Sequence, residues 1–450
     1  MLKGIVSFCL LLVLLPYISL GQSNYSYETH SIAEIEKKGH STLKLAQTHV
    51  VQSIDFTYAR AEWTILPPTA SISGKVTYYF KSTASSNDSL FLDLNNQLEI
   101  SSIQQEGQAL SYSHLNNTIS IQLLHPNEGG IDSLSIEYAG SPVSSGFGSF
   151  NVMASPGGDQ YVWTLSEPYG ASDWWPVRTE LGDKLDSLDV IVFTSNPNQA
   201  SGNGKLLSIT NSADGRYYHW QERHPIAMYL VGIAVGPYLT LSDIIPLRTA
   251  NTPLINFIYP EKLTDWQNAA GYQKNMLQFF DSLIIPYPFS DEKYGQVQFG
   301  WGGGMEHQTM SSVSDPGEML LAHELAHQWF GDHVTCGSWS DIWLNEGFAT
   351  YFTGVYIERF YPSSFQQWKT DHQENIFQAN DGSVFVSDTS AISRIFDGRL
   401  SYAKGAMVLH MLRKRIGDTA FFQGLRNYLN SEEHAAGFAR TADLKHYCEN

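Results

Sequence analysis

The stretch LAHELAHQWF, residues 321–330, constrains the fold of this chain more than any other. It places His323 and His327 four positions apart in a run that is otherwise mostly apolar. On an α-helix this spacing brings both imidazoles to one face, where they can hold a divalent metal ion at about 2.0–2.1 Å. Glu324 follows His323 directly, so its carboxylate lies beside the metal and suits a general base. The sequence therefore predicts a metal site carried by a helix.

A third metal ligand is predicted on the next helix. A catalytic zinc ion usually has three protein ligands and one open position. The segment WLNEGFATYF, residues 343–352, supplies Glu346, and eighteen residues separate it from His327. A single histidine would more simply be a structural residue, but these side chains together favour a metal site. Two imidazoles and a carboxylate suit Zn²⁺, so we expect one zinc ion per chain.

The local pattern around these residues predicts three strong helices, over residues 316–330, 341–360 and about 402–416. Asp315 is predicted as the N-cap of the first, with Pro316 at its first position and Glu318 completing a capping box. Gly331 is expected to end it. A further helix is predicted over residues 265–284 and a strand over residues 293–301.

The preceding part of the chain is strand-like from about residue 56 to residue 241. Runs such as SGKVTYYF, TISIQLL, DSLSIEYAG, LDVIVFTS and AMYLVGIAVGPY are separated by Gly, Asn, Ser and Pro turns. We therefore expect an α+β multidomain fold. An N-terminal domain of antiparallel sheets, forming a sandwich or saddle over residues 22–245, precedes a mainly helical domain over residues 246–450.

The first residues, MLKGIVSFCLLLVLLPYISLGQSN, combine a positive start, a short apolar core and a small-residue cleavage site. This pattern predicts a secretory signal peptide over residues 1–21, with a retained anchor as the alternative. We expect a secreted or periplasmic protein with no membrane span after signal removal. Cys9 leaves with the signal, and the sequence leaves open whether Cys336 and Cys448 pair.

The charge balance bears on partners. The formal net charge is −18, from 27 Lys and Arg against 45 Asp and Glu, and there is no basic run. We therefore expect no nucleic-acid partner. At the other end of the chain, TADLKHYCEN begins like a capped helix, and we expect the catalytic domain to continue beyond residue 450.

The motifs GGGMEH, HELAHQWFGD and LNEGFATYF, in this order and spacing, resemble those of zinc aminopeptidases of the aminopeptidase N type. These belong to the gluzincin metallopeptidases, which share their metal site with thermolysin. TLSEPYGASDWWP and SYAKGAMVLHMLR extend the resemblance over most of residues 50–450. It implies a thermolysin-like catalytic domain that removes the N-terminal residue from peptides.

The resemblance also implies how the substrate is held. Gly303, Gly304, Met305 and Glu306 occupy the family motif that receives the free α-amino group of the substrate. A fixed carboxylate at Glu306 would pair with the ammonium and select chain ends. His307 stands where the family usually has asparagine, which leaves the orientation of Glu306 open. Without the resemblance, Glu306 would be taken for a solvated loop residue.

Two further roles follow from the resemblance. Glu167 matches a second amine-binding acid, and Tyr402 matches a tyrosine that donates a hydrogen bond to the oxyanion of the tetrahedral intermediate. The alternative for Glu167 is a surface glutamate before a proline turn, and the alternative for Tyr402 is a packing residue at a helix start. Asp332, His333 and His410 lie near these motifs, and we assign them structural roles.

These predictions describe a zinc-dependent aminopeptidase with Glu324 as general base and with peptides that have a free N-terminus as substrates. Two alternatives stay open. One is a secreted, non-catalytic binding protein that retains the fold, and the other is an endopeptidase or epoxide hydrolase on the same scaffold. The preferred N-terminal residue and the oligomeric state are not predicted.

Overall fold

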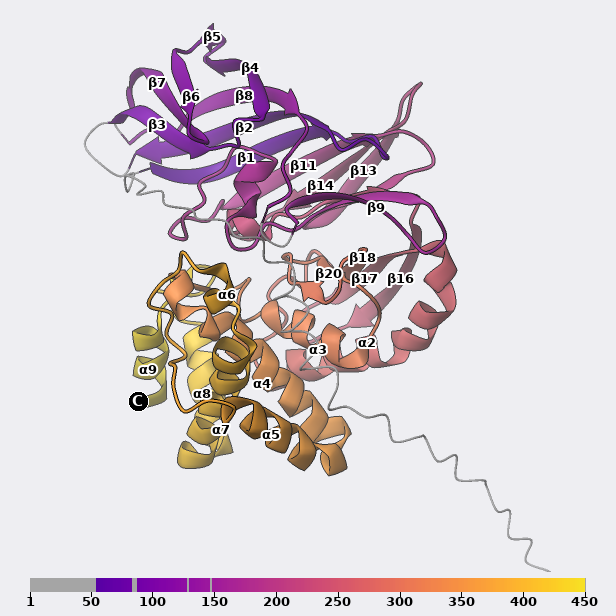
Figure 1. Cartoon of the computed structure of the whole chain (residues 1–450), viewed down its shortest axis with the longest axis vertical. Helices are drawn as coiled ribbons and strands as arrows, with labels where there is room; N and C mark the ends of the chain where they lie inside the picture. Colours follow the sequence, from indigo (N-terminus) through magenta and orange to yellow (C-terminus); the bar gives the residue numbers. More distant parts are fainter. Residues whose placement is uncertain (1–53, 83–86, 128, 146–147, 450) are drawn as a thin grey trace, which may run out of the picture.

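The computed structural model of the chain describes residues 54–82, 87–127, 129–145 and 148–449. A strand-rich part formed by the first half of the sequence lies over a helix-rich part formed by the second half (Figure 1). This arrangement confirms the predicted fold class. The predicted signal peptide, residues 1–21, and residues 22–53 of the predicted N-terminal domain lie outside the described residues.

The largest sheet has eight strands in the order β13-β14-β11-β1-β2-β8-β4-β5. Their bounds are β1 (Ile54–Thr64), β2 (Ile72–Ser82), β4 (Leu98–Gln105), β5 (Gln108–Ala109), β8 (Asp132–Gly140), β11 (Ser187–Thr194), β13 (Lys205–Asn211) and β14 (Arg216–Glu222). Every second residue of β2 is buried, as in a strand with one face on a core. The predicted antiparallel pairing holds except that β1 and β11 run parallel, which the long connection between them permits.

Two smaller sheets complete the strand-rich part. One consists of β3 (Asn87–Asp93), β7 (Thr118–Asn127) and β6 (Tyr112–Leu115), and the other of β12 (Gln199–Ser201), β15 (Ala234–Gly236), β10 (Gln160–Thr164) and β9 (Phe150–Ala154). The prediction of one strand over residues 227–238 is wrong in part. A 3₁₀ turn, η2 (Met228–Leu230), precedes the short β15. This apolar run is buried except at Pro237, and burial alone does not distinguish a strand from a turn.

A five-stranded sheet connects the two parts of the chain. Its order is β16 (Leu239–Pro246), β17 (Asn251–Ile258), β18 (Tyr294–Gln298), β20 (Ser311–Val313) and β19 (Gly304–Met305). β17, β18 and β20 run parallel, and the two outer strands run antiparallel to their neighbours. β18 confirms the strand predicted over residues 293–301. The domain boundary predicted after residue 245 falls at the end of β16 and stays a prediction.

The helices lie below this sheet (Figure 1). They are α2 (Leu263–Leu283), α3 (Glu318–His327), α4 (Trp343–Phe360), α5 (Pro362–Ile376), α6 (Ile392–Ile395), α7 (Gly405–Ile416), α8 (Asp418–Leu429) and α9 (Thr441–Glu449). Short helical turns are η1 (Gly170–Asp173), η3 (Pro260–Lys262), η4 (Trp339–Asp341) and the π-helical η5 (Gly398–Lys404), and β21 (Thr335–Cys336) pairs with β22 (Phe438–Ala439). The helices predicted over residues 265–284 and 341–360 are confirmed as α2 and α4.

The helix predicted over residues 316–330 is shorter than expected, and its predicted cap is wrong. α3 begins at Glu318, and Asp315 accepts a hydrogen bond from the backbone N–H of Gly317 at 2.8 Å, ahead of the helix. The carboxylate of Glu318 does not turn back to close a capping box. It accepts hydrogen bonds from the hydroxyls of Tyr356 and Tyr361, and these hydroxyls are stronger donors than a backbone N–H.

Both α3 and the first four turns of α4 are buried on all sides. A helix buried all round belongs to the core of a domain, so a charged side chain on it needs a partner inside the protein. Cys336 and Cys448 are free thiols in the structure. Within the described parts of the chain, no helix is both long and apolar enough to cross a bilayer.

Candidate metal centre and substrate site

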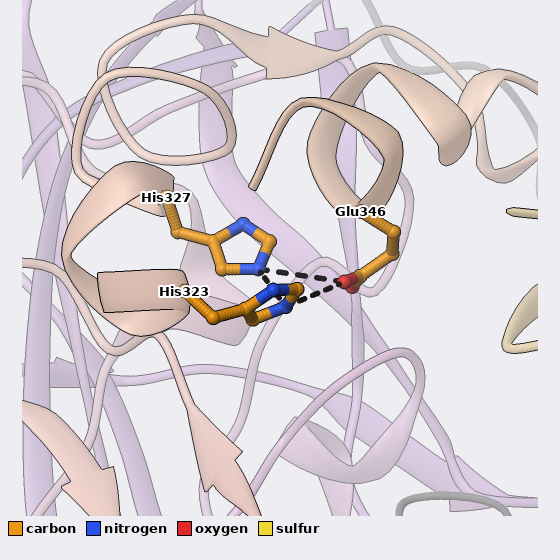
Figure 2. Close-up of side chains that lie close together, drawn as sticks. All are labelled: His323, His327 and Glu346. Carbon is orange, nitrogen blue, oxygen red and sulfur yellow. Dashed lines mark hydrogen bonds and ion pairs between the residues drawn. The ribbon is translucent and has the colours of Figure 1, made fainter. Parts of the chain in front are cut away.

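Three side chains from α3 and α4 converge on one point (Figure 2). His323 and His327 project from one face of α3, and Glu346 projects from the first turn of α4. The two Nε2 atoms lie 3.2 Å apart, and Oε2 of Glu346 lies 3.4 Å from each of them. Ligand atoms about 2.0–2.1 Å from a tetrahedral zinc ion are about 3.3–3.4 Å from one another. The three atoms therefore have the spacing of three corners of such a site.

The electrostatic environment of this group favours a cation. Burial lowers the pKa of His323. Burial alone would also lower the pKa of His327, but the carboxylates of Glu306 and Glu346 raise it well above its usual value. Burial opposes ionisation of Glu346, yet the two histidines hold its pKa at about 2. The carboxylates thus favour positive charge next to the imidazoles. A divalent ion bound to neutral imidazole rings would supply that charge.

The backbone orients one of the predicted ligands. Nδ1 of His327 lies 3.1 Å from the carbonyl oxygen of Phe330. Donation of the Nδ1 proton to this oxygen leaves the Nε2 lone pair directed at the site, as in most metal-bound histidines. Asn345, next to Glu346, accepts a hydrogen bond from the backbone N–H of Cys336 at 3.1 Å and so holds the start of α4.

Glu324 lies next to the metal group, with its carboxylate against β19. A Cβ atom added to Gly304 would be 2.1 Å from Oε1 of Glu324, so only glycine leaves room for the carboxylate here. Oε2 of Glu324 has no hydrogen-bond partner among the described residues. Burial raises the pKa of Glu324 well above its usual value, against the lowering effect of His327. A carboxylate of this kind has a high affinity for a proton.

A cluster of three carboxylates adjoins the metal group. Oxygens of Glu167, Glu306 and Glu346 lie within 4.8 Å of one another, and all three residues are buried. Glu167 follows β10 of the strand-rich part, whereas Glu306 follows β19. Burial raises the pKa of Glu306 to about 7, and Glu346 adds to the effect. Because three anions lie close together with few hydrogen bonds, the cluster suits a cationic group such as an ammonium.

A small cavity lies over these carboxylates. Its lining includes Glu167, Glu306 and four large apolar side chains: Leu165, Trp301, Met305 and Phe396. Its volume, about 10 Å³, is close to the space that one water molecule needs.

Tyr402 lies in η5, and the helix start predicted near this residue is wrong. The π-helical turn begins at Gly398, where Asp397 accepts hydrogen bonds from the backbone N–H groups of Arg399 and Leu400, and α7 follows from Gly405. π-Helical turns are frequent at functional sites. The ring of Tyr402 is buried and nearly parallel to that of His323, with centroids 6.1 Å apart.

A close approach of two helices holds Tyr402 beside the metal group. A Cβ atom added to Gly347 would lie 2.9 Å from Cα of Gly405, and the reverse is also true. Gly347 follows Glu346, and Gly405 comes three residues after Tyr402. These glycines allow α4 and the start of α7 to touch through their backbones, which brings Glu346 and Tyr402 to the same site.

The structure thus places Glu324, Tyr402, Gly304, Met305, Glu306 and Glu167 around the metal group, while His333, assigned a structural role, has another partner. His333 lies 3.0 Å from the carbonyl oxygen of Leu429, and burial lowers its pKa to about 4. The cavity residues Leu165, Trp301 and Phe396 were not predicted. Leu165 lies within the TLSEPYG motif and Trp301 directly precedes GGGMEH, which is a usable signal, but nothing in the sequence marks Phe396.

Comparison with known proteins agrees with this geometry. Residues 305–450 match the peptidase family M1 domain. This match covers the part of the chain that carries α3, α4 and Tyr402. Probable aminopeptidase 1 of Sulfurisphaera tokodaii is 25% identical over 363 residues, which are 74% of this chain and 44% of that protein. Glutamyl aminopeptidase of Bos taurus is 30% identical over 250 residues, which are 50% of this chain and 26% of that protein.

Solved structures share the fold over nearly the whole chain. A two-domain M1 zinc metallopeptidase variant bound to L-tryptophan has a TM-score of 0.78 and 24% identity, with 90% of this chain and 92% of that chain covered. The M1 zinc metallopeptidase of Deinococcus radiodurans has a TM-score of 0.76 and 24% identity, with 88% and 90% covered. By contrast, the chain spans less than half the length of the curated relatives named above.

Proposed function

We propose that this chain is a zinc-dependent aminopeptidase of peptidase family M1 that hydrolyses the first peptide bond of substrates with a free N-terminus. The observation that carries the proposal is the position of the three-carboxylate cluster, which directly adjoins the metal group and shares Glu346 with it. A metal centre alone would serve any peptidase, whereas a buried anionic cluster beside it selects an ammonium at a short distance from the reacting bond.

The donor set fits zinc. Two imidazole nitrogens and one carboxylate oxygen, at the spacing measured above, leave one tetrahedral corner open. His323, His327 and Glu346 would hold the ion. When bound, zinc supplies Lewis acidity toward the attacking water and the peptide carbonyl.

The side chains around the metal group divide the remaining work. Glu324 accepts the proton of the attacking water and delivers it to the departing amine, for which its high proton affinity is suited. The hydroxyl of Tyr402 donates a hydrogen bond to the oxyanion. Glu306 and Glu167 pair with the α-ammonium of the substrate. One residue is removed per turnover.

A matched pair of peptides tests the proposal. We expect the zinc-loaded chain to release only the first residue from a short peptide with a free N-terminus and to leave the N-acetylated form of the same peptide intact. Exchange of Glu306 for glutamine keeps the shape but removes the charge, and we expect it to reduce this preference.

The two alternatives predict different results. Equal cleavage of both peptides would contradict amine recognition and favour an endopeptidase. Absence of hydrolysis of either peptide, with zinc bound at one ion per chain, would favour a non-catalytic binding protein. A chelator should abolish activity and added zinc should restore it. Secretion through the predicted signal peptide remains part of the proposal, and fractionation of cells that express the full chain tests it.

A further inference from the structure

The segment that follows Glu306 is a tight, buried turn. We call residues 306–310 the amine loop. The backbone N–H of Met310 donates to the carbonyl oxygen of His307 at 2.9 Å, and Thr309 has a φ of 64°. A positive φ is rare for a β-branched residue, so the surroundings must hold Thr309 in this conformation.

The strand-rich part of the chain supplies one side of the surroundings. Nδ2 of Asn203 donates hydrogen bonds to the carbonyl oxygens of Gln308, at 2.7 Å, and Leu230, at 3.0 Å. Oδ1 of Asn203 accepts from the N–H of Gly232 at 2.9 Å. The N–H of Gly204 donates to Oγ1 of Thr309 at 2.7 Å. Asn203 is only 1% exposed, so water does not compete for these bonds.

The helix-rich part supplies the other side. Oε1 of Gln328, the residue after the predicted ligand His327, accepts from the N–H of Thr309 at 2.8 Å. Nζ of Lys293 donates to the carbonyl oxygen and to Oγ1 of Thr309, both at 3.0 Å. The amine loop is therefore fixed between Asn203 and the end of the helix that carries the metal group.

The packing leaves the loop no room to shift. A Cβ atom added to Gly232 would be 2.4 Å from Cδ2 of His307, so the imidazole lies flat against this backbone. Nδ1 of His307 is 3.0 Å from Oγ of Ser312 on β20. The histidine that replaces the usual asparagine thus packs against the same strand-rich segment that Asn203 bonds.

We propose that Asn203 is a positioning residue that sets the distance between the carboxylate of Glu306 and the metal group. The inference rests on the proposed function, in which Glu306 binds the α-ammonium. Asn203 touches neither substrate nor metal in this account. It acts through the backbone of Gln308, two residues from Glu306, and its loss would release the amine loop from the strand-rich part of the chain.

Two hydroxamates that differ in one group test the inference. Leucine hydroxamate carries an α-amino group, and 4-methylpentanoyl hydroxamate has the same carbon skeleton without it. We expect Asn203→Ala in the zinc-loaded chain to raise the Kd of leucine hydroxamate about tenfold. The Kd of the second compound should stay unchanged, and calorimetry measures both values. Asn198→Ala is the matched control, because its side-chain amide is also buried and, among the described residues, donates only to Thr194 and Ser195 of its own turn.

The outcomes separate the inference from the function on which it rests. If the unchanged chain binds both hydroxamates equally, amine recognition fails. If the unchanged chain prefers the amino compound and Asn203→Ala retains the full preference, the positioning role is wrong. If Asn203 had only a structural role, Asn203→Ala would weaken the binding of both hydroxamates alike or lower the zinc content. Should Asn203→Ala not fold, Thr309→Val removes the hydroxyl oxygen that accepts from the N–H of Gly204, the residue after Asn203, and the same selective loss is expected.

Discussion

Exchange of Gly304 for alanine is a direct test of how Glu324 is placed. The added Cβ would lie 2.1 Å from Oε1, 2.4 Å from Cδ and 2.8 Å from Cγ of Glu324. Real Cβ atoms do not approach other atoms this closely, so the carboxylate has to move. The strand β19 cannot retreat easily, because Met305 pairs with Ser312 of β20.

The size of the effect follows from these distances. An ordinary contact of about 3.4–4 Å requires a displacement of more than 1 Å from the present position of Oε1. A misplacement of about 1 Å in a catalytic group can cost about a hundredfold in rate. We therefore expect Gly304→Ala to lower kcat for an aminoacyl amide about a hundredfold. KM and zinc content should change little, because neither ammonium binding nor the metal group is touched.

The assay needs kcat, KM and zinc content on the same preparations. Gly271→Ala is the matched control: nothing lies within 4 Å of the added Cβ, and the residue is in the middle of α2. We expect normal activity for this control and a stability gain of about 1 kcal/mol. Full activity of Gly304→Ala would refute the placement of Glu324 against β19, and loss of zinc would refute the separation of the general base from the metal group.

Two further predictions concern Tyr402 and Lys184. Tyr402→Phe should lower kcat by about 10²–10³-fold, the usual loss of one oxyanion donor, with zinc and KM retained, and an unchanged kcat would remove Tyr402 from the mechanism. Burial lowers the pKa of Lys184 to about 7, against 10.5 for an unburied lysine. Between these values the unfolded chain binds a proton that the folded chain does not, so stability rises with pH. Lys184→Met should remove up to about 1.4 kcal/mol per pH unit of that rise, and equal slopes for both chains in denaturant titrations at pH 7–10 would contradict the assignment.

The helices around the metal group were predictable because local rules govern them. A four-residue spacing determines which helix face His323 and His327 share, and their apolar neighbours determine that the helix is buried. The boundaries of this helix, α3, were harder to predict. Glu318 has the right position for a capping box, but it accepts hydrogen bonds from two tyrosines on a distant segment. Local sequence patterns do not predict contacts between distant segments.

The substrate side of the site depends on tertiary contacts. The approach of Glu167 to Glu306 requires that two separate sheets meet, and no local pattern predicts that meeting. Gly304 was predicted as part of the motif that receives the α-amino group, whereas the structure shows that it also makes room for the carboxylate of Glu324. Asn203 lies in a turn of ordinary composition, and only its hydrogen bonds reveal its connection to the amine loop.

The central claim is that His323, His327 and Glu346 together bind one zinc ion. Diffraction from crystals of the zinc-loaded chain at the zinc absorption edge tests it directly. The account predicts a single strong anomalous peak about 2.0–2.1 Å from Nε2 of both histidines and from Oε2 of Glu346. A peak elsewhere, or no peak beside these atoms when the crystals contain zinc, would contradict it.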